Sequence, residues 1–260
     1  MPAVSGGRHH RERSPSGPPL LARWRKLVED PSPVPPGAGI LPDRPSRLPM
    51  SLSDPDSPAG AQPDPAGADL ERLRRAIASG DPAQAMPALA GLREVETEAA
   101  IPLLLLGLAQ EPFLIRSLAC AGLGVKRSEA GWQALVRALQ SDGDANVRAE
   151  AANALASFGV ERAWPLLRQA FELDVQWLVR CSILSALAEQ PEISLPWLLE
   201  LADLAIADGD GTVRVGGAEI LGRLVREGDE PLALQARSLL APLQADPDHR
   251  VVAAALDGLQ

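Results

Sequence analysis

Apolar residues along most of the chain recur at the three- and four-residue intervals of an amphipathic helix. The pattern begins near residue 68, where Leu70, Leu73 and Ile77 share one helical face. The sequence GDP at 80–82 then ends one predicted helix and starts another, because Asp is a good N-cap and Pro suits the first helical position. Residues 68–96 are therefore predicted to form a helix pair.

A repeated motif follows, in which an apolar residue and an arginine precede small residues and a leucine. It occurs as FLIRSLACAGLG at 113–124, ANVRAEAANALA at 145–156, WLVRCSILSALA at 177–188 and GTVRVGGAEILG at 211–222. The arginines are spaced by 32, 32 and 34 residues: Arg116, Arg148, Arg180 and Arg214. A tryptophan series has spacings of 32 and 33 residues: Trp132, Trp164 and Trp197. Two independent series at one period indicate a repeat of two helices in about 32–36 residues.

This repeat predicts an all-α fold, an α-solenoid or superhelix of stacked antiparallel helix pairs. The first helix of each pair, helix A, carries the tryptophan series and is expected at about 100–109, 130–140, 161–172, 194–207 and 230–243. The second, helix B, carries the arginine series and is expected at about 112–124, 145–157, 176–189, 211–226 and 247–258. Residues 97–260 would then hold five repeats, and the pair at 68–96 would cap their N-terminal end.

Residues 1–67 have a different composition, rich in Pro, Gly, Ser and Arg. Such a segment cannot bury a core, so we expect a disordered tail. Within it, only LLARWRKLV at 20–28 has amphipathic character. The segment 1–49 has a second explanation, because Met50 is followed by SLSDPDSPAG, which is typical of an acidic, soluble N-terminus. Residues 1–49 are thus either part of the tail or a mis-assigned start.

Composition and charge narrow the function. Apolar residues make up 46% of the chain but aromatic residues only 3%, which favours closely packed Leu- and Ala-rich helices. Residues 50–260 hold 17 Lys and Arg against 30 Asp and Glu. An acidic folded part argues against nucleic-acid binding, which needs a basic surface. No apolar run reaches the 18 residues of a membrane span.

The candidate chemistry is sparse. Cys120 and Cys181 lie far apart in the sequence and belong to no CxxC pair, so both are expected to be small buried helix residues. Free thiols suit a reducing compartment, and we expect a cytoplasmic protein. No phosphate loop, HExxH or GxSxG motif is present, and His249 is isolated. The sequence therefore predicts no catalytic residue, no metal site and no cofactor.

The arginine and tryptophan series have a structural and a functional interpretation. Acids precede each arginine by four to six residues: Glu111, Asp144, Asp174, and Asp208 or Asp210. We expect each guanidinium to pair with such an acid in its own or the next repeat, because its planar fork suits bridging. The tryptophans are expected to pack between helices. The alternative is that both series contact a ligand or partner directly.

Residues that differ between repeats are better candidates for recognition. Helix B usually lines the inner face of such arrays, and its polar side would carry the differing positions. Trp177 stands where sister repeats have Ala145 and Gly211, and is expected to be an exposed anchor. The predicted partner-binding residues are Glu150, Asn153, Trp177, Ser182, Ser185, Glu219 and Arg223. The alternative is an ordinary solvated face.

The stretch DANVRAEAANALASFG at 144–159 resembles HEAT-like repeats, especially the short type of the cyanobacterial phycobilisome lyases. The resemblance extends over residues 97–260. It implies a HEAT-like solenoid whose partner is another protein, in phycobilisome assembly or turnover a phycobiliprotein. It also implies two alternatives: a component of a bilin lyase or chaperone, which would handle a bilin, and an adaptor in iron–sulfur or other assembly. The resemblance transfers no catalytic residue.

Overall fold

The computed structural model describes residues 65–260, and within this range every regular element is helical. The all-α prediction is confirmed. Residues 1–64, including the segment 20–28 and the alternative start at Met50, lie outside the described residues. The described residues all belong to one unit. The first helix begins at Pro65, so it includes the last three residues of the predicted tail, 65–67.

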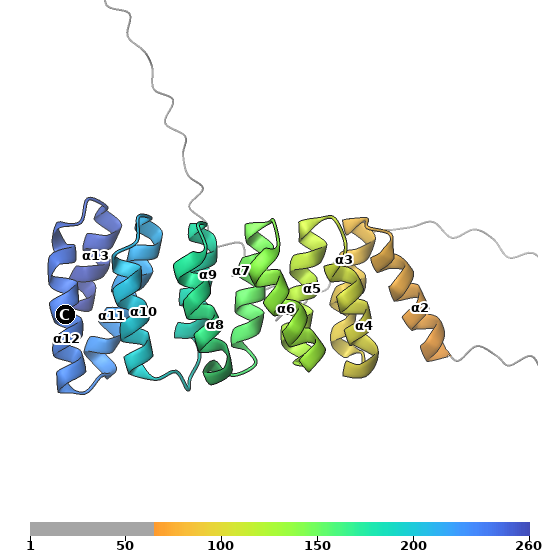
Figure 1. Ribbon diagram of the computed structural model, residues 1–260, viewed down its shortest axis with the longest axis horizontal. Helices are drawn as coiled ribbons and strands as arrows, with labels where there is room; N and C mark the ends of the chain where they lie inside the picture. Colours follow the sequence, from red (N-terminus) through yellow and green to blue (C-terminus); the bar gives the residue numbers. More distant parts are fainter. Residues whose placement is uncertain (1–64) are drawn as a thin grey trace, which may run out of the picture. The chain divides into compact units, whose positions relative to one another are not determined.

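The described residues contain a leading helix pair and five further pairs, drawn side by side in chain order in Figure 1. The leading pair is α2 (Pro65–Ala78) and α3 (Pro82–Gly91), followed by the 3-10 turn η1 (Leu92–Glu94). The A helices are α4 (Thr97–Leu108), α6 (Glu129–Ser141), α8 (Val160–Leu173), α10 (Leu195–Ile206) and α12 (Glu230–Leu240), the last continued by η2 (Ala241–Ala245). The B helices are α5 (Phe113–Lys126), α7 (Ala145–Ala156), α9 (Trp177–Ala188), α11 (Gly211–Glu227) and α13 (His249–Gly258).

Local sequence sets where the B helices begin. Asp144, Asp210 and Asp248 are the N-caps of α7, α11 and α13, and each accepts a hydrogen bond from the backbone N–H two residues further on. This bond satisfies one of the N–H groups that a helix leaves unpaired at its start. Three A helices are also capped by short polar side chains, each of which accepts from the backbone N–H three residues further on: Ser128, Ser194 and Asp229.

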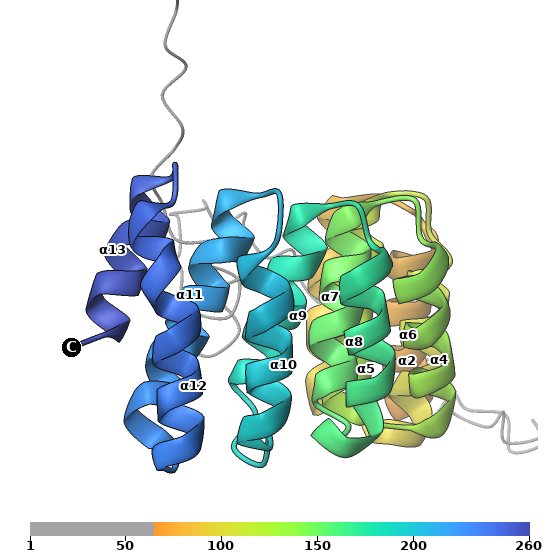
Figure 2. The same ribbon diagram turned by 60° about the vertical axis from the view of Figure 1, so that its left-hand side comes forward.

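The B helices pack closely against one another along the stack, whereas successive A helices make few contacts. Small residues permit this approach: a Cβ on Gly124 of α5 would lie 2.9 Å from Cα of Ala154 in α7. A stack that is tighter on one side curves towards that side, so the B helices line the inner face. Figure 2 shows α8, α10 and α12 together on the opposite side.

We predict that Gly124→Ala destabilises the protein by about 1–3 kcal/mol, because the added methyl group meets backbone that cannot move aside cheaply. Urea unfolding followed by circular dichroism measures the change. Gly143→Ala is the matched control, because a Cβ on Gly143 has nothing within 4 Å. Equal stability of the two variants would contradict the close approach of α5 and α7.

Candidate functional site

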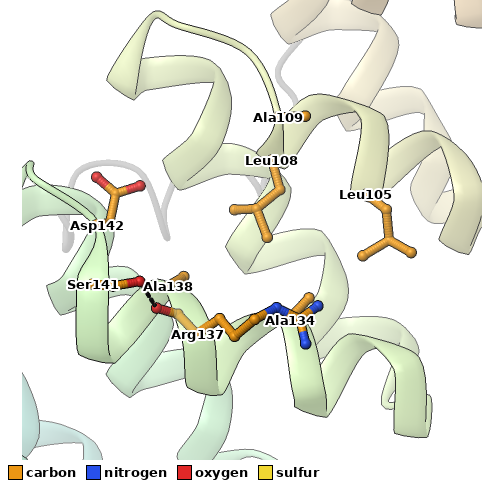
Figure 3. A pocket seen from close by; sticks show the side chains of 8 residues that line it. All are labelled: Leu105, Leu108, Ala109, Ala134, Arg137, Ala138, Ser141 and Asp142. Atoms are coloured by element: carbon orange, nitrogen blue, oxygen red, sulfur yellow. Dashed lines mark hydrogen bonds between the residues drawn. The ribbon is translucent and has the colours of Figure 1, made fainter.

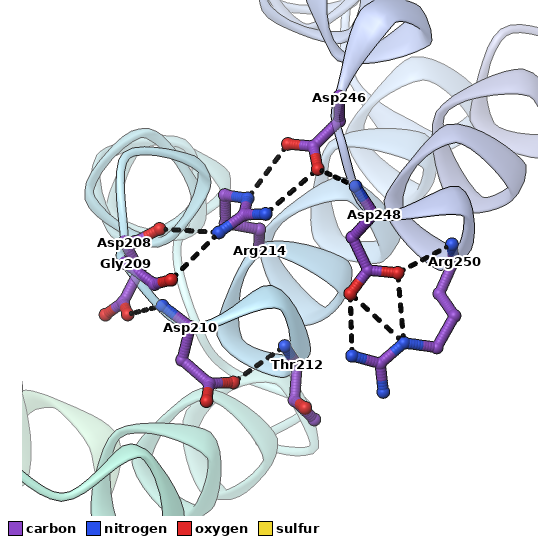
Figure 4. A network of polar contacts seen from close by, with 8 residues as sticks. All are labelled: Asp208, Gly209, Asp210, Thr212, Arg214, Asp246, Asp248 and Arg250. Carbon is purple, nitrogen blue, oxygen red and sulfur yellow. Dashed lines mark hydrogen bonds and ion pairs between the residues drawn. The ribbon is translucent and has the colours of Figure 1, made fainter. Parts of the chain in front are cut away.

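The four repeat arginines form one continuous series of contacts, which we call the Arg–Asp ladder. Each guanidinium donates from Nε and Nη2 to both carboxylate oxygens of an aspartate in the following A–B loop, over 2.6–3.0 Å. The pairs are Arg116–Asp142, Arg148–Asp174, Arg180–Asp208 and Arg214–Asp246. Figure 4 shows the last of them. Two parallel hydrogen bonds fix the relative orientation of the two groups, in addition to bringing their opposite charges together.

The ladder also ties each loop to its own repeat. The carboxylate of Asp174 accepts from Arg148 of the preceding B helix and from the backbone N–H of Gln176, 2.9 Å away. Its backbone carbonyl accepts from Nη1 of Arg180 at 2.7 Å. Asp142 and Asp208 make the same three kinds of contact. One aspartate therefore joins two successive repeats.

The expectation for the acids is corrected in part. Asp174 and Asp208 belong to the ladder, and each pairs with the arginine of the preceding repeat, 26 or 28 residues earlier. Of the two expected arrangements, it is therefore pairing with an acid of the next repeat that occurs. Asp144 caps α7 and Asp210 caps α11, while Glu111 offers Arg116 only its backbone carbonyl. An arginine in the first turn of a B helix reaches backbone in its own loop, and the nearest carboxylate comes from the loop stacked beside it.

Two ladder aspartates, Asp142 and Asp246, were missed from the sequence. The available signal was an aspartate two residues before the N-cap of α7, α9, α11 and α13. In the first three of these helices, the same aspartate also stands six residues before the repeat arginine. The ladder ends where that arginine is replaced. The fourth residue after the N-cap is Ala85 in α3 and Val252 in α13, at the two ends of the described stack. At the N-terminal end the acceptor is replaced as well, because Gln110 stands two residues before Pro112, the N-cap of α5.

Burial and charge make the ladder a structural element. Its arginine side chains are 14–18% exposed and its aspartate side chains 8–11%. Burial acts to raise the pKa of Asp142 and Asp174, but hydrogen bonds from the guanidinium and from backbone N–H outweigh it and hold both pKa values below 3.8. The Arg214 guanidinium likewise lowers the pKa of Asp246. The carboxylates of Asp142, Asp174 and Asp246 are therefore charged at neutral pH, and all four ladder carboxylates are occupied by an arginine.

The tryptophan series packs between A helices. Trp132 and Trp164 are buried, and Trp197 is half-buried. The rings of Trp164 and Trp197 stack with centroids 5.0 Å apart and an interplanar angle of 3°, joining α8 to α10. Trp132 meets Phe158 edge to face at 5.4 Å. These rings contribute packing between repeats.

The predicted partner-binding residues separate into engaged and exposed groups. Ser182 is only 5% exposed, so its assignment to the surface is wrong. It lies on the same helical stripe as Val179 and Ile183, which face the core. Arg223 pairs with Glu227 at 2.7 Å and also donates to the carbonyl of Ala188 at the end of α9. It thereby caps a neighbouring helix.

Three of the remaining candidates form a row across the inner face. Asn153 of α7, Ser185 of α9 and Glu219 of α11 occupy the same position in successive B helices. Asn153 is half-buried, and the other two are exposed. Glu150 is half-buried beside α5, where its charge helps to raise the pKa of Cys120. We call Asn153, Ser185 and Glu219 the inner-face row.

Exposed apolar residues at the α8–α9 connection were missed, apart from Trp177. Leu173 is 71% exposed, Val175 84% and Trp177 45%. We call these three side chains the loop ridge. The signal in the sequence was a bulky residue at two positions where the neighbouring loops have Gly, Ser or Ala.

A depression of about 470 Å³ opens between α4 and α6 (Figure 3). Its polar lining consists of Arg137, Ser141 and Asp142. Asp142 is paired with Arg116, and the Ser141 hydroxyl donates to the Arg137 carbonyl at 2.7 Å. The depression therefore holds no assembled set of groups for catalysis.

The two thiols are poor nucleophiles. Cys120 is buried, and burial followed by the charges of Glu150 and Asp142 raises its pKa. Cys181 is half-buried, and burial raises its pKa to about 11. Both remain protonated at neutral pH, and the thiolate is the reactive form. In the described residues, no three His, Cys, Asp or Glu side chains are arranged to hold a metal ion.

No helix in residues 65–260 combines the length and apolar character that crossing a membrane requires.

Comparison with known proteins identifies the repeat. Residues 101–188 match a family model described as HEAT repeats, which confirms the HEAT-like prediction for α4 to α9. No curated protein matched the sequence. Similar solved structures include an engineered protein, with 21% identity and a TM-score of 0.45 over 74% of this chain and 95% of that chain. They also include the CpcE–CpcF complex of phycocyanin lyase from Nostoc sp. PCC7120, with 18% identity and a TM-score of 0.35 over 74% and 99%.

We predict that Arg148→Met lowers the free energy of unfolding by about 2–4 kcal/mol, because it leaves the mostly buried Asp174 carboxylate without its cation. Chemical denaturation measures this loss. Arg72→Met is the control, because the Arg72–Asp69 pair is 73% and 70% exposed and should contribute less than about 0.5 kcal/mol. A loss no larger at Arg148 than at Arg72 would show that the ladder is not a structural element.

The ladder also predicts how the stability of the fold changes at acid pH. The pKa values of Asp142, Asp174 and Asp246 are lower in the folded state than 3.8. Their stabilisation is therefore complete above pH 3.8 or so and is lost as the pH falls through the folded-state values. Thermal unfolding between about pH 6 and pH 2 should show Tm falling below about pH 4. The Asp174→Asn variant should have a lower Tm at neutral pH, and its Tm should fall less on acidification. If its Tm falls as much as that of the natural chain, the ladder aspartates are not the origin of the acid sensitivity.

Proposed function

We propose that this chain is a non-catalytic protein-binding scaffold, which presents its inner face to another protein. One observation carries the proposal: the residues that recur between repeats are engaged in the scaffold, while several of the residues that differ lie at the surface. Arg148 and Trp164 illustrate the first group, and Ser185 and Glu219 the second. A surface that changes from repeat to repeat on a constant frame suits recognition of an extended partner.

The inner-face row supports this function physically. Its three side chains come from consecutive helices whose relative positions the Arg–Asp ladder holds. A helix or loop laid across the B helices would meet Asn153, Ser185 and Glu219 in turn. These groups are an amide, a hydroxyl and a carboxylate, so they favour polar or basic partner residues. The occupied ladder carboxylates and the protonated thiols offer no groups for covalent chemistry.

The first partner to test is an apo-phycobiliprotein, because residues 144–159 resemble the repeats of phycobilisome lyases. The scaffold proposal expects the chain to co-purify with it after co-expression, without adding a chromophore. Phycobilisome assembly or turnover would then be the process served. Failure to form this complex would reject the phycobiliprotein assignment.

The same resemblance supports a second candidate, a component of a bilin lyase that works with another subunit. Co-expression with a bilin and an apo-phycobiliprotein separates the two functions. A lyase component yields visible absorbance that stays with the phycobiliprotein after denaturation, whereas a scaffold yields a complex without it. An adaptor in iron–sulfur or other assembly would form neither product.

We predict that the double substitution Ser185→Arg and Glu219→Arg weakens partner binding at least about tenfold, because it places two bulky cations in the centre of the inner face. Titration calorimetry or a quantitative pull-down measures the change. Gln169→Arg with Gln235→Arg is the matched control, since these exposed glutamines lie on α8 and α12 of the outer row. Equal binding by both variants would remove the inner face from the interface.

A further inference from the structure

Exposed apolar side chains concentrate at one edge of the stack. The described residues contain eight large apolar residues classed as exposed, and five of them lie at the edge where A helices connect to B helices. They are Phe113, Leu114, Leu173, Val175 and Trp177. The three residues of the loop ridge belong to a single connection, between α8 and α9. Apolar groups gathered at one place on a surface indicate an interaction site.

The fold does not require bulky residues in the loop ridge. The α6–α7 loop has Ser141, Gly143 and Ala145 at the corresponding positions, and the α10–α11 loop has Ala207, Gly209 and Gly211. All three loops make the same contacts: a carboxylate held by the preceding arginine, a carbonyl held by the following arginine, and a bond to the N–H two residues on. The extra side chains therefore add nothing to the ladder.

The loop that carries the ridge is held firmly. Asp174 lies between Leu173 and Val175, and it is hydrogen-bonded by Arg148, by Arg180 and by the backbone of Gln176. An apolar side chain on a fixed backbone loses less conformational freedom when it is covered than one on a mobile loop. The ridge is thus preorganised for contact.

The charge around the ridge is negative. The N-caps of the two neighbouring loops, Asp144 and Asp210, form no ion pair in the described part of the chain. Asp144 accepts from the backbone N–H and the side-chain amide of Asn146, and Asp210 accepts from the backbone N–H of Thr212. Residues 50–260 as a whole have an excess of acids. A partner that covers the ridge gains from cations placed beside its apolar residues.

The size of the ridge selects the kind of partner. Three side chains bury on the order of a few hundred Å². A stable complex of globular surfaces, including a dimer of this chain, needs roughly 1,200–2,000 Å². The ridge instead matches a short linear segment. It also adjoins the inner-face row, because Trp177 and Ser185 are separated by eight residues and so lie near one stripe of α9.

We propose that the loop ridge is a docking site for a short segment of a partner protein, in which apolar residues alternate with Lys or Arg. The inference rests on the proposed scaffold function and adds to it the position and chemistry of a second contact. The apolar residues of the segment cover Leu173, Val175 and Trp177. Its cations approach the carboxylates of Asp144 and Asp210.

The test uses the full chain and a loop-exchange variant: Leu173→Ser, Val175→Gly and Trp177→Ala. This variant reproduces the α6–α7 loop, so it should keep the ladder and fold normally; the thermal unfolding temperature checks this. Fluorescence anisotropy measures binding of a labelled peptide of about 12 residues, in which Leu or Trp alternates with Lys. Its twin has Glu in place of Lys.

The natural chain should bind the Lys peptide at least about tenfold more tightly than the loop-exchange variant does, and at least about tenfold more tightly than it binds the Glu twin. Leu234→Ser, which removes a 63% exposed leucine from α12, should leave binding unchanged. Raising the salt concentration should weaken binding of the Lys peptide.

Equal affinity of the natural chain and the loop-exchange variant overturns the docking site, as does equal affinity for the two peptides. A natural chain that is a dimer by light scattering, and a monomer after loop exchange, assigns the ridge to a second copy and also overturns the proposal. Loss of peptide binding only with Ser185→Arg and Glu219→Arg places the peptide on the inner face. That outcome rejects the ridge but leaves the scaffold function standing.

Discussion

The bidentate contact between an arginine of one B helix and an aspartate of the next loop is the interaction on which the repeat stack depends. A helix pair of this length cannot cover its own apolar faces, so each repeat needs its neighbour. Apolar packing supplies most of the attraction, but it is non-directional. The two hydrogen bonds from Arg148 to the Asp174 carboxylate set the position of one repeat on the next. The bond from Arg180 to the backbone carbonyl of Asp174 then links this contact to the next arginine of the ladder.

This arrangement separates residues that build the stack from residues available to a partner. A guanidinium with two carboxylate oxygens and a carbonyl has few donors left to offer, and a mostly buried carboxylate gives a partner little access. The tryptophans of the A helices are likewise covered by neighbouring rings. Recognition must then come from positions that the frame does not use, and these are the inner-face row and the loop ridge. Glu219 in the row, and Asp144 and Asp210 in the loops beside the ridge, favour a partner with cations.

Periodicity alone located the five repeats and the leading pair, because helical spacing and capping residues are local properties of the sequence. The same locality explains the errors. Ser182 is polar and was placed on the surface, but its helix turns it towards the core beside Val179. Arg223 was assigned to a partner, whereas the end of α9 lies within its reach. Neither outcome depends on the residue's own neighbours in sequence; both depend on how one helix is rotated against another.

The sequence by itself therefore determined the fold class, the order of the helices and the identity of the recurring arginines and tryptophans. It did not determine which carboxylate each arginine contacts. Asp144 and Asp210, the nearest acids before Arg148 and Arg214, are N-caps, and the true partner of each ladder arginine lies 26 to 32 residues further on. Only stacking brings that aspartate within hydrogen-bond distance. Exposure was decided in the same way, because Leu173 and Val175 resemble core residues in sequence and become surface residues only when the loop is fixed at the edge of the stack.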